Sequence, residues 1–204
     1  MTRFTGWPEQ AFDVLLQLDG DPSVAQRQKC RRDRERLVRQ PMAALLNDVA
    51  DADPRYDDFS VWGYGTMVWW WQHQGAVVRI GGKLELGLRF DLDGLDVSGG
   101  WANGAQDKYR AAVAQESTGR ELDAILKALQ GNGCELSGDV MKRNPRGYPA
   151  DHPRSELLRY RSFSVTQPLG CDDWLHTPEA VDRVLASFAE LRPLTSWLLE
   201  HAPG

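Results

Sequence analysis

The sequence has few cysteines and no long apolar run. Its three cysteines, Cys30, Cys134 and Cys171, are far apart and form no CxxC pair or Cys/His ligand spacing. This pattern argues against a disulfide framework and against a zinc site. No stretch approaches the roughly 18 apolar residues of a membrane span, and the first residues lack the apolar core of a secretory signal. We therefore expect a cytoplasmic protein without a membrane-bound part.

The common catalytic and nucleotide-binding motifs are also missing. The chain contains no GxGxxG, P-loop, GxSxG or HExxH pattern. The pairs Gly81-Gly82 and Gly99-Gly100 are interpreted as turn glycines, because neither precedes a helix at the spacing of a phosphate-binding loop. Asp91, Asp93 and Asp96 are close in sequence, but an Asp-Gly hairpin explains them better than a metal site. We expect neither a cofactor nor a metal.

Charge and size narrow the choice of partner. The chain has 204 residues and a net charge of −5, with an ordinary share of apolar residues. A chain of this length can bury a core without staples, and one domain covering residues 1–204 is expected. The acidic balance makes nucleic acid an unlikely partner. The sequence does not indicate the oligomeric state.

The order of patterns along the chain predicts an α+β fold. Helical periodicity in the first 50 residues is followed by a segment rich in β-branched and aromatic residues, and helical periodicity then returns. The turn signals are Gln74-Gly75, Gly81-Gly82 and Asp93-Gly94. They separate four expected strands, at residues 66–73, 76–80, 83–92 and 95–98. We expect a twisted antiparallel β-meander sheet packed with helices from both ends of the chain.

Further elements are expected on both sides of the meander. Helices are predicted at 8–18, 23–50 (kinked or restarted at Pro41), 105–115, 118–129, 154–160 and after Thr177-Pro178, with a strand at 162–167. Pro193 is expected to bend the last helix.

Several stretches resemble a known family. The clearest is KRNPRGYPADHP at 142–153, followed by ELLR at 156–159. FTGWP at 4–8, RQPMAALL at 39–46 and YRAAV at 109–113 also fit. Together they resemble a conserved hypothetical bacterial family, domain of unknown function 2461. The resemblance implies a fold of this class and little chemistry, because the family has no assigned activity.

The sequence departs from the pattern of that family at two places. Members usually carry a basic Asp-Lys-x-Pro-Tyr-Lys stretch before or within the sheet, where this chain has WGYGTMVWWW at 62–71. Family members also usually carry an aromatic pair early in the second helix. This pair is missing here, and the chain has Gln26 and Arg27 near that point. If the common activity of the family uses the lost stretch, this protein lacks that activity.

The tryptophan-rich meander supplies the main candidate for a ligand site. With three tight hairpins, one face of the sheet would carry the predicted ligand-binding residues Trp69, Trp71, His73, Glu85 and Arg89. Gly87 would leave a recess beside the tryptophans and an ion pair of Glu85 with Arg89. Such a recess would bind a small aromatic or anionic molecule, with His73 or Glu85 as a proton-transfer group. Alternatively, helices cover both faces and the tryptophans belong to the core.

Two other segments have a functional and a structural interpretation. His152, beside Asp151, is a candidate general base, but capping of the helix that begins at Pro153 explains the pair more simply. An anion site with Arg146 and Arg154 is the remaining interpretation there.

The basic run at 27–39 holds seven cations against two acids. A solvated helix face explains this run, and binding of an acidic partner or nucleic acid is the alternative.

The sequence therefore leaves two classes of function open. The first is a small-molecule enzyme or binding protein that uses the tryptophan-walled recess. The second is a non-catalytic interaction module that uses exposed aromatic side chains or the basic helix at 27–39. A closed pocket with a perturbed histidine would favour the first, and a flat exposed aromatic patch would favour the second. The residues do not decide whether the protein is an enzyme.

Overall fold

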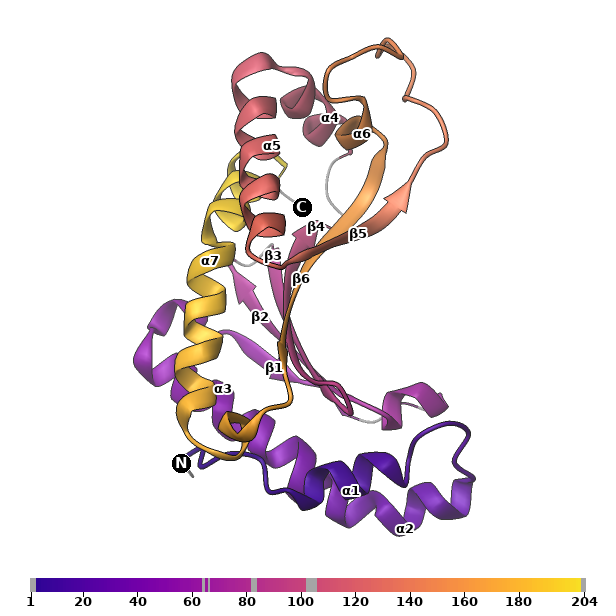
Figure 1. Ribbon diagram of the computed structural model, residues 1–204, viewed down its shortest axis with the longest axis vertical. Coiled ribbons are helices and arrows are strands. Elements are labelled where there is room, and N and C mark those ends of the chain that lie inside the picture. The colour runs from indigo at the N-terminus through magenta and orange to yellow at the C-terminus, as the bar shows by residue number, and fades with distance from the viewer. Residues whose placement is uncertain (1–2, 64, 66, 82–83, 102–105, 203–204) are drawn as a thin grey trace. The chain divides into compact units, whose positions relative to one another are not determined.

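The protein is an α+β structure built on an antiparallel sheet (Figure 1). The computed structural model describes residues 3–63, 65, 67–81, 84–101 and 106–202. Their strands form one six-stranded sheet in the order β1-β2-β3-β4-β6-β5. The predicted fold class is confirmed. Of the sequence-based predictions, those for residues 64, 66, 82–83 and 105 lie outside the described residues.

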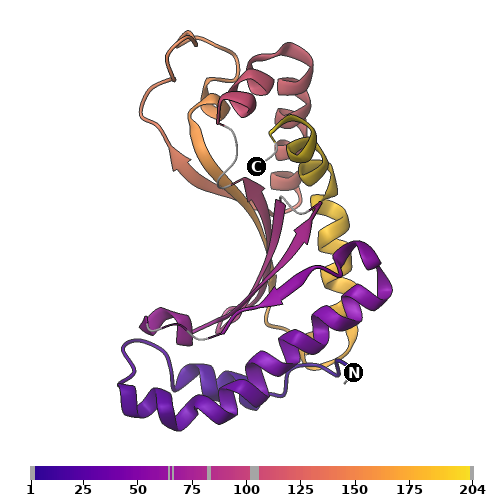
Figure 2. The same cartoon turned by 180° about the vertical axis from the view of Figure 1, so that it is seen from behind.

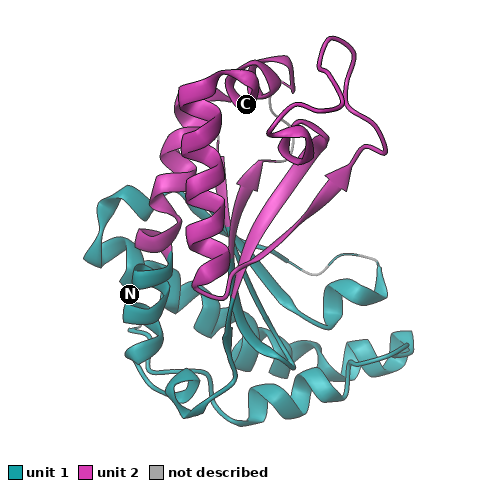
Figure 3. Cartoon of the chain, turned by 45° about the horizontal axis from the view of Figure 1, so that its top comes forward, with its two compact units in different colours: residues 1–78, 87–97, 168–187 teal, residues 79–86, 98–167, 188–204 magenta. Residues whose placement is uncertain are grey.

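Packing divides the chain into two compact units (Figure 3). Unit 1 comprises Met1–Val78, Gly87–Val97 and Pro168–Ser187, and unit 2 comprises Arg79–Leu86, Ser98–Gln167 and Phe188–Gly204. Each unit combines segments that are distant in sequence. The single domain expected from the sequence stays a prediction.

The strands follow the Asp93-Gly94 turn signal, but the predicted turn at Gln74-Gly75 is wrong, because both residues lie inside a strand. The strands are β1 (Phe59–Val61), β2 (Gln74–Ile80), β3 (Leu84–Asp91), β4 (Gly94–Trp101), β5 (Glu135–Val140) and β6 (Tyr160–Gly170). Side chains alternate along β3, where Leu86, Leu88 and Phe90 are buried while Glu85 and Arg89 are exposed. The hairpin at Asp93-Gly94 joins β3 to β4 as predicted.

Helices occupy both ends of the chain. They are α1 (Gln10–Leu16), α2 (Val24–Arg34), η1 (Glu35–Arg39), α3 (Gln40–Ala52), η2 (Pro54–Tyr56), η3 (Val68–Trp71), α4 (Gln106–Ala114), α5 (Glu116–Gly131), α6 (Ser155–Leu158), η4 (Asp173–His176) and α7 (Glu179–His201). None of the helices in the described residues combines the length and apolar character that crossing a membrane requires.

The predicted long second helix is interrupted before Pro41. Ser23 accepts a hydrogen bond from the backbone N–H of Gln26 and caps α2, as its residue type favours. One π-helical turn, η1, then separates α2 from α3, whose first turn contains Pro41. The change to π-helical bonding directly before the proline, with the Gln40 N–H donating to the Glu35 carbonyl oxygen, lets the helix accommodate a residue that has no N–H. The helical conformation continues through Arg39 and Gln40, so the interruption expected at Pro41 takes the form of this π-helical turn and not of a new helix start.

Unit 1 has an aromatic core around the N-terminal segment. Trp7 stacks on Phe90 with ring centroids 4.4 Å apart, and its indole N–H donates to the carbonyl oxygen of Val38 at 3.1 Å. Phe4 packs edge-on against Trp7 at 5.1 Å. Burial of several large side chains at one place contributes most of the driving force for folding of such a unit.

Unit 2 has a second aromatic cluster. Trp101 stacks on Tyr109 at 4.4 Å, and Trp197 meets the same tyrosine edge-on at 6.3 Å. The Tyr109 hydroxyl donates to the carbonyl oxygen of Leu157 at 3.1 Å, which ties α4 to α6. Burial raises the pKa of the Tyr109 phenol well above its usual range.

The predicted strand at 66–73 is wrong. The structure has a 3₁₀ turn, η3, at Val68–Trp71, and the first strand of the sheet is β1 at Phe59–Val61. β1 pairs with β2 in an antiparallel register that places Phe59 opposite Val78. Tryptophan has a high strand propensity, but tertiary contacts override such propensities. Here the carbonyl groups of the segment bond to a buried arginine.

Candidate functional site

A buried arginine holds the backbone of the tryptophan segment. Arg34, at the end of α2, is 1% exposed. Its guanidinium group donates to the carbonyl oxygens of Trp70 at 3.1 Å, Trp71 at 3.1 Å and His73 at 2.6 Å. It also donates to the side-chain amide oxygen of Gln74 at 3.3 Å. A planar group with five N–H donors can hold several carbonyl groups of one turn in a fixed conformation.

Arg39 and Gln74 fix the neighbouring segment that carries Trp62. Arg39 donates to the carbonyl oxygens of Val61 at 3.3 Å and Trp62 at 3.2 Å. The side-chain amide of Gln74 donates to the same Trp62 oxygen at 2.9 Å. The Trp62 ring lies against Gly75, where a Cβ atom would come within 2.5 Å of the ring. The absence of a side chain at residue 75 therefore lets the tryptophan lie flat on the strand.

The rings of these segments form one contiguous surface. Trp69 and Trp70 stack with centroids 4.5 Å apart, and Trp62 meets Trp70 at 5.6 Å. Trp69 is 49% exposed, Trp62 38% and Met67 57%. The backbone N–H of Trp70 donates to the carbonyl oxygen of Met67 at 3.2 Å. We call Trp62, Met67, Trp69 and Trp70 the tryptophan face.

The tryptophan face adjoins the turn between α1 and α2. The side-chain amide of Gln72, directly after η3, donates to the carbonyl oxygen of Gly20 at 2.7 Å. Figure 2 shows the short η3 helix beside the α1–α2 turn. Two further large apolar side chains are exposed near that turn: Leu16 in the last turn of α1 and Val24 in the first turn of α2. Large exposed apolar groups that gather in one region are typical of interaction surfaces.

The structure brings only some of the predicted ligand-binding residues together. The His73 ring stacks on Trp69 at 5.7 Å with an interplanar angle of 12°. Trp71 is buried, and its indole N–H donates to the carbonyl oxygen of Gly65 at 3.2 Å. Trp71 is therefore committed to the protein interior, and Trp69 is the exposed member of the pair.

The predicted ion pair of Glu85 with Arg89 is wrong. Arg89 pairs with Asp91 at 2.7 Å in unit 1, and Glu85 pairs with Arg79 at 3.6 Å in unit 2. Both Arg89 and Glu85 are exposed. The alternation along β3 does place both on the same side of that strand, but each has a nearer partner than the other.

The electrostatic environment of His73 disfavours its charged form. Burial lowers the pKa of the His73 imidazole, and the positive charges of Arg89 and Arg34 lower it further. A contact with the backbone of Trp69 and the charge of Asp91 act on this pKa in the opposite direction. His73 is thus neutral at neutral pH and stacks on Trp69 as an uncharged ring.

The lowered pKa of His73 predicts a stability that falls in acid. The unfolded chain has a histidine pKa of about 6.5, so it binds a proton before the folded protein does. The stabilisation that neutral His73 provides is fully present above the unfolded-state pKa. It is lost as the pH falls through the lower pKa of the folded protein. We expect urea denaturation of wild type between about pH 7 and pH 5 to show a steeper loss of stability than His73→Gln. Equal slopes for the two proteins would contradict this expectation.

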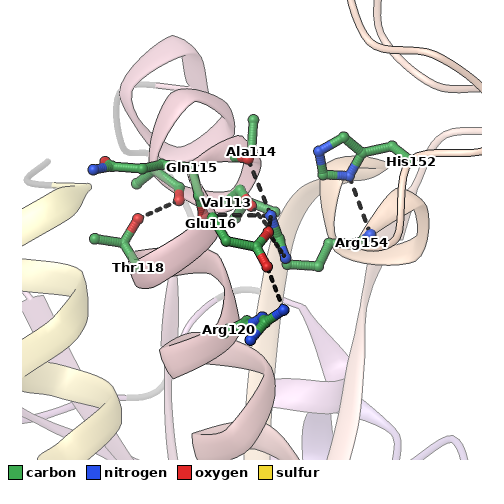
Figure 4. Close-up of polar contacts among 9 residues, drawn as sticks. Val113, Ala114, Gln115, Glu116, Thr118, Arg120, His152 and Arg154 are labelled. Carbon is green, nitrogen blue, oxygen red and sulfur yellow. Dashed lines mark hydrogen bonds and ion pairs between the residues drawn. The ribbon is translucent and has the colours of Figure 1, made fainter.

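The second sequence candidate, His152, makes a local backbone contact. Its Nδ1 accepts a hydrogen bond from the backbone N–H of Arg154 at 3.1 Å (Figure 4). The helix that follows, α6, begins at Ser155 and not at Pro153 as predicted. The N-cap residue of α6 is Arg154, without a side-chain cap hydrogen bond, so the His152 contact fixes the turn before α6 and does not cap the helix.

Arg154 itself cross-links unit 2. It is buried and donates to the carbonyl oxygens of Val113 at 2.7 Å and Ala114 at 3.0 Å, and it pairs with the Glu116 carboxylate at 3.2 Å (Figure 4). The Arg154 hydrogen bond, together with the nearby Arg120, holds the pKa of the Glu116 carboxyl below its usual range. With these internal partners, Arg154 is a structural group and a poor candidate for the anion site that the sequence left open.

Sequence reasoning missed the residues that organise the tryptophan face. Arg34 was part of the basic run at 27–39 and was expected on a solvated face. A signal was present, because Cys30, Arg34 and Val38 are spaced four residues apart, and all three are buried. In the described part of the chain, no group of three or more His, Cys, Asp or Glu side chains is placed to hold a metal ion.

Comparison with known proteins connects the chain to one family. Residues 89–197 match the sequence model of a family described as conserved hypothetical protein, DUF2461. The matched segment contains the stretches at 109–113 and 142–159, and it begins after α2 and the tryptophan face. No curated protein and no solved structure gave a match. Because the match covers more than half of the chain, the protein belongs to the DUF2461 family of conserved hypothetical proteins.

Proposed function

We propose that the protein is a non-catalytic interaction module that binds a partner polypeptide through the tryptophan face. The observation that carries the proposal is the exposure of Trp62, Met67 and Trp69 on two segments that contain backbone carbonyl groups bonded to Arg34 or Arg39. Exposed tryptophans of fixed conformation are effective anchors, because they bury a large area at a small cost in conformational entropy. Most large apolar side chains of the protein are buried, so this exposure is unusual within the chain.

Binding is favoured over catalysis by the state of the titratable groups. His73 is buried, stacked on Trp69, and has a lowered pKa. The other proposed proton-transfer group, Glu85, is an exposed residue of unit 2 that pairs with Arg79. The segment therefore presents an apolar surface, and the two groups proposed for proton transfer have separate surroundings in the described structure.

A peptide selection tests this function. A random peptide library displayed on phage would be selected on the wild-type protein, and the enriched peptides would be synthesised and titrated. We expect Trp69→Ala to weaken their binding by at least about tenfold, which corresponds to about 1.4 kcal/mol.

The matched control is Val140→Ala, which removes an exposed apolar side chain from β5 in unit 2. This variant is expected to bind the peptides as wild type does. Failure to enrich any peptide, or equal binding by Trp69→Ala and wild type, would show that the tryptophan face is not the interaction surface.

A small aromatic or anionic ligand is the second candidate. The charge of Arg89 acts on His73, which stacks on Trp69, so a cation and an exposed ring lie in the same region. A thermal-shift screen of metabolites would distinguish this candidate from the first, because a small ligand should raise the melting temperature of wild type but not of Arg89→Ala.

We also propose that the protein works in the cytoplasm. The three cysteines are free thiols, and Cys30 and Cys134 are buried. Free thiols are the usual state of cysteine in a reducing compartment.

A further inference from the structure

We infer that the partner segment is acidic and that Arg31 is the residue of the protein that selects it. The inference rests on the proposed function and adds the chemistry of the partner. A carboxylate of the partner would pair with Arg31 while a neighbouring aromatic or aliphatic side chain packs on the tryptophan face.

The position of Arg31 follows from the two arginines beside it on α2. The guanidinium carbons of Arg27 and Arg34 lie 6.0 Å and 5.9 Å from the centroid of the Trp71 ring. Both residues therefore face the η3 segment. On an α-helix, Arg31 is about 40° from Arg27 and about 60° from Arg34 around the axis. Arg31 thus belongs to the face of α2 that adjoins the tryptophan segment.

Arg31 is the exposed arginine of this face. Arg34 is buried against backbone carbonyl groups, and Arg27 is half-buried over Trp71. Within the described residues, the Arg31 side chain makes no hydrogen bond or ion pair. An exposed guanidinium group at the edge of an apolar surface keeps its donors available for a bound carboxylate.

Both acids of the basic run at 27–39 already have arginine partners. Asp33 pairs with Arg36 at 3.1 Å, and Glu35 pairs with Arg39 at 2.9 Å. Residues 27–39 contain seven cations and only these two acids, in a chain whose net charge is −5. The run at 27–39 therefore carries an excess of positive charge on the side of the tryptophan face formed by α2, and a carboxylate of a partner would complement it there.

An acidic polypeptide fits this surface better than nucleic acid does. Stacking bases and cationic grooves are the usual means of binding single strands, and tryptophan with arginine could serve both purposes. A chain of net charge −5 nevertheless repels a nucleic acid, which carries a charge at every nucleotide, whereas a polypeptide that mixes carboxylates with uncharged residues has a lower charge density and can use the local positive charge. Single-stranded DNA is accordingly an arm of the test.

Lys29 provides a matched control on the same helix. It is exposed, and it makes no hydrogen bond or ion pair within the part of the chain that the structure describes. It lies about 160° around the axis from Arg31, on the opposite side of α2. Lys29→Ala and Arg31→Ala change the net charge equally, so they separate the position of the charge from its amount.

The test is a fluorescence titration of the full chain with three probes. These are a random Glu–Tyr copolymer, a Lys–Tyr copolymer of matched composition, and oligothymidine. We expect the Glu–Tyr copolymer to change the tryptophan fluorescence at lower concentration than either other probe. Arg31→Ala should weaken its binding by about fivefold to tenfold, and Lys29→Ala by less than about twofold. Added salt should reduce the difference between the two variants.

The outcomes separate the inference from the proposed function. Equal losses for Arg31→Ala and Lys29→Ala, tighter binding of the Lys–Tyr copolymer or of oligothymidine, or no binding of the Glu–Tyr copolymer would each overturn the acidic-partner inference. If Trp69→Ala abolishes binding of the tyrosine copolymers while Arg31→Ala has no effect, the interaction surface stands and the role of Arg31 is refuted. If Trp69→Ala binds as wild type does, the proposed function falls with the inference.

Discussion

Arg34→Met is expected to lower the free energy of unfolding by about 3–5 kcal/mol. Arg34 is almost fully buried, and its guanidinium group donates to the carbonyl oxygens of Trp70, Trp71 and His73. Methionine keeps most of the apolar stem but supplies no donor. The carbonyl groups would then lose their protein partners in a poorly solvated place, and each unsatisfied buried group costs about 1–3 kcal/mol.

The loss should affect the tryptophan face before the rest of unit 1. The backbone of residues 70–73 is bonded to Arg34, whereas the Trp7–Phe90 stack is held by other contacts. We therefore expect Arg34→Met to change the near-ultraviolet circular dichroism and the fluorescence of the tryptophans at temperatures where the far-ultraviolet signal is still native. Local opening at a lower free energy than global unfolding is common for surface segments.

Urea denaturation would measure the effect, and Arg36→Met is the control. Arg36 is two residues further along the chain and forms an exposed pair with Asp33. Exposed pairs contribute about 0–1 kcal/mol, so this variant should be nearly as stable as wild type. If the two variants lose equal stability, the buried hydrogen bonds of Arg34 do not contribute the expected amount of about 3–5 kcal/mol to the free energy of unfolding.

Those strands of the meander could be predicted in which the apolar alternation and the turn residues indicate the same structure as the packing of the core. In β3, the alternation of Leu86, Leu88 and Phe90 with polar residues coincides with a strong Asp-Gly turn, and the structure follows both signals. The strand β5 was missed, because Glu135–Val140 is almost entirely exposed and carries no apolar alternation. Pairing with β6, a long-range contact, defines it.

The tryptophan segment shows why the candidate site could not be predicted in the same way. Three consecutive tryptophans at 69–71 have a high strand propensity, and a strand would have placed Trp69 and Trp71 on one face. The 3₁₀ turn instead exposes Trp69 and buries Trp71. The deciding contacts come from Arg34, more than thirty residues earlier, and no local pattern reports them.

The same reasoning applies to the charged residues. The run at 27–39 was interpreted as one solvated face, yet its arginines differ in kind. Arg34 is interior, Arg39 bonds to the backbone of Trp62, and Arg31 is exposed without a partner in the described residues. Sequence gives the number of charges, and only the helix orientation assigns their roles.

Arg154→Met is expected to lower the free energy of unfolding by about 2–4 kcal/mol, through unit 2. Arg154 bonds to the carbonyl oxygens of Val113 and Ala114 at the end of α4 and to the Glu116 side chain at the start of α5. These are carbonyl groups that a helix end leaves without partners, so the arginine acts as a cap supplied from a distant segment.

The fit of Arg154 against α5 explains why this cap cannot easily be replaced. A Cβ atom at Gly119 would come within 2.4 Å of the Arg154 Nε atom, so the missing side chain makes room for the guanidinium group. With methionine at residue 154, that space would be left partly empty and the α4 carbonyl groups would lose their donors. The control is Arg161→Met, which breaks a half-exposed pair with Asp139 and should cost less than about 1 kcal/mol. If the urea midpoints of the two variants fall equally, the buried hydrogen bonds of Arg154 stabilise the protein no more than an exposed ion pair does, and the prediction is wrong.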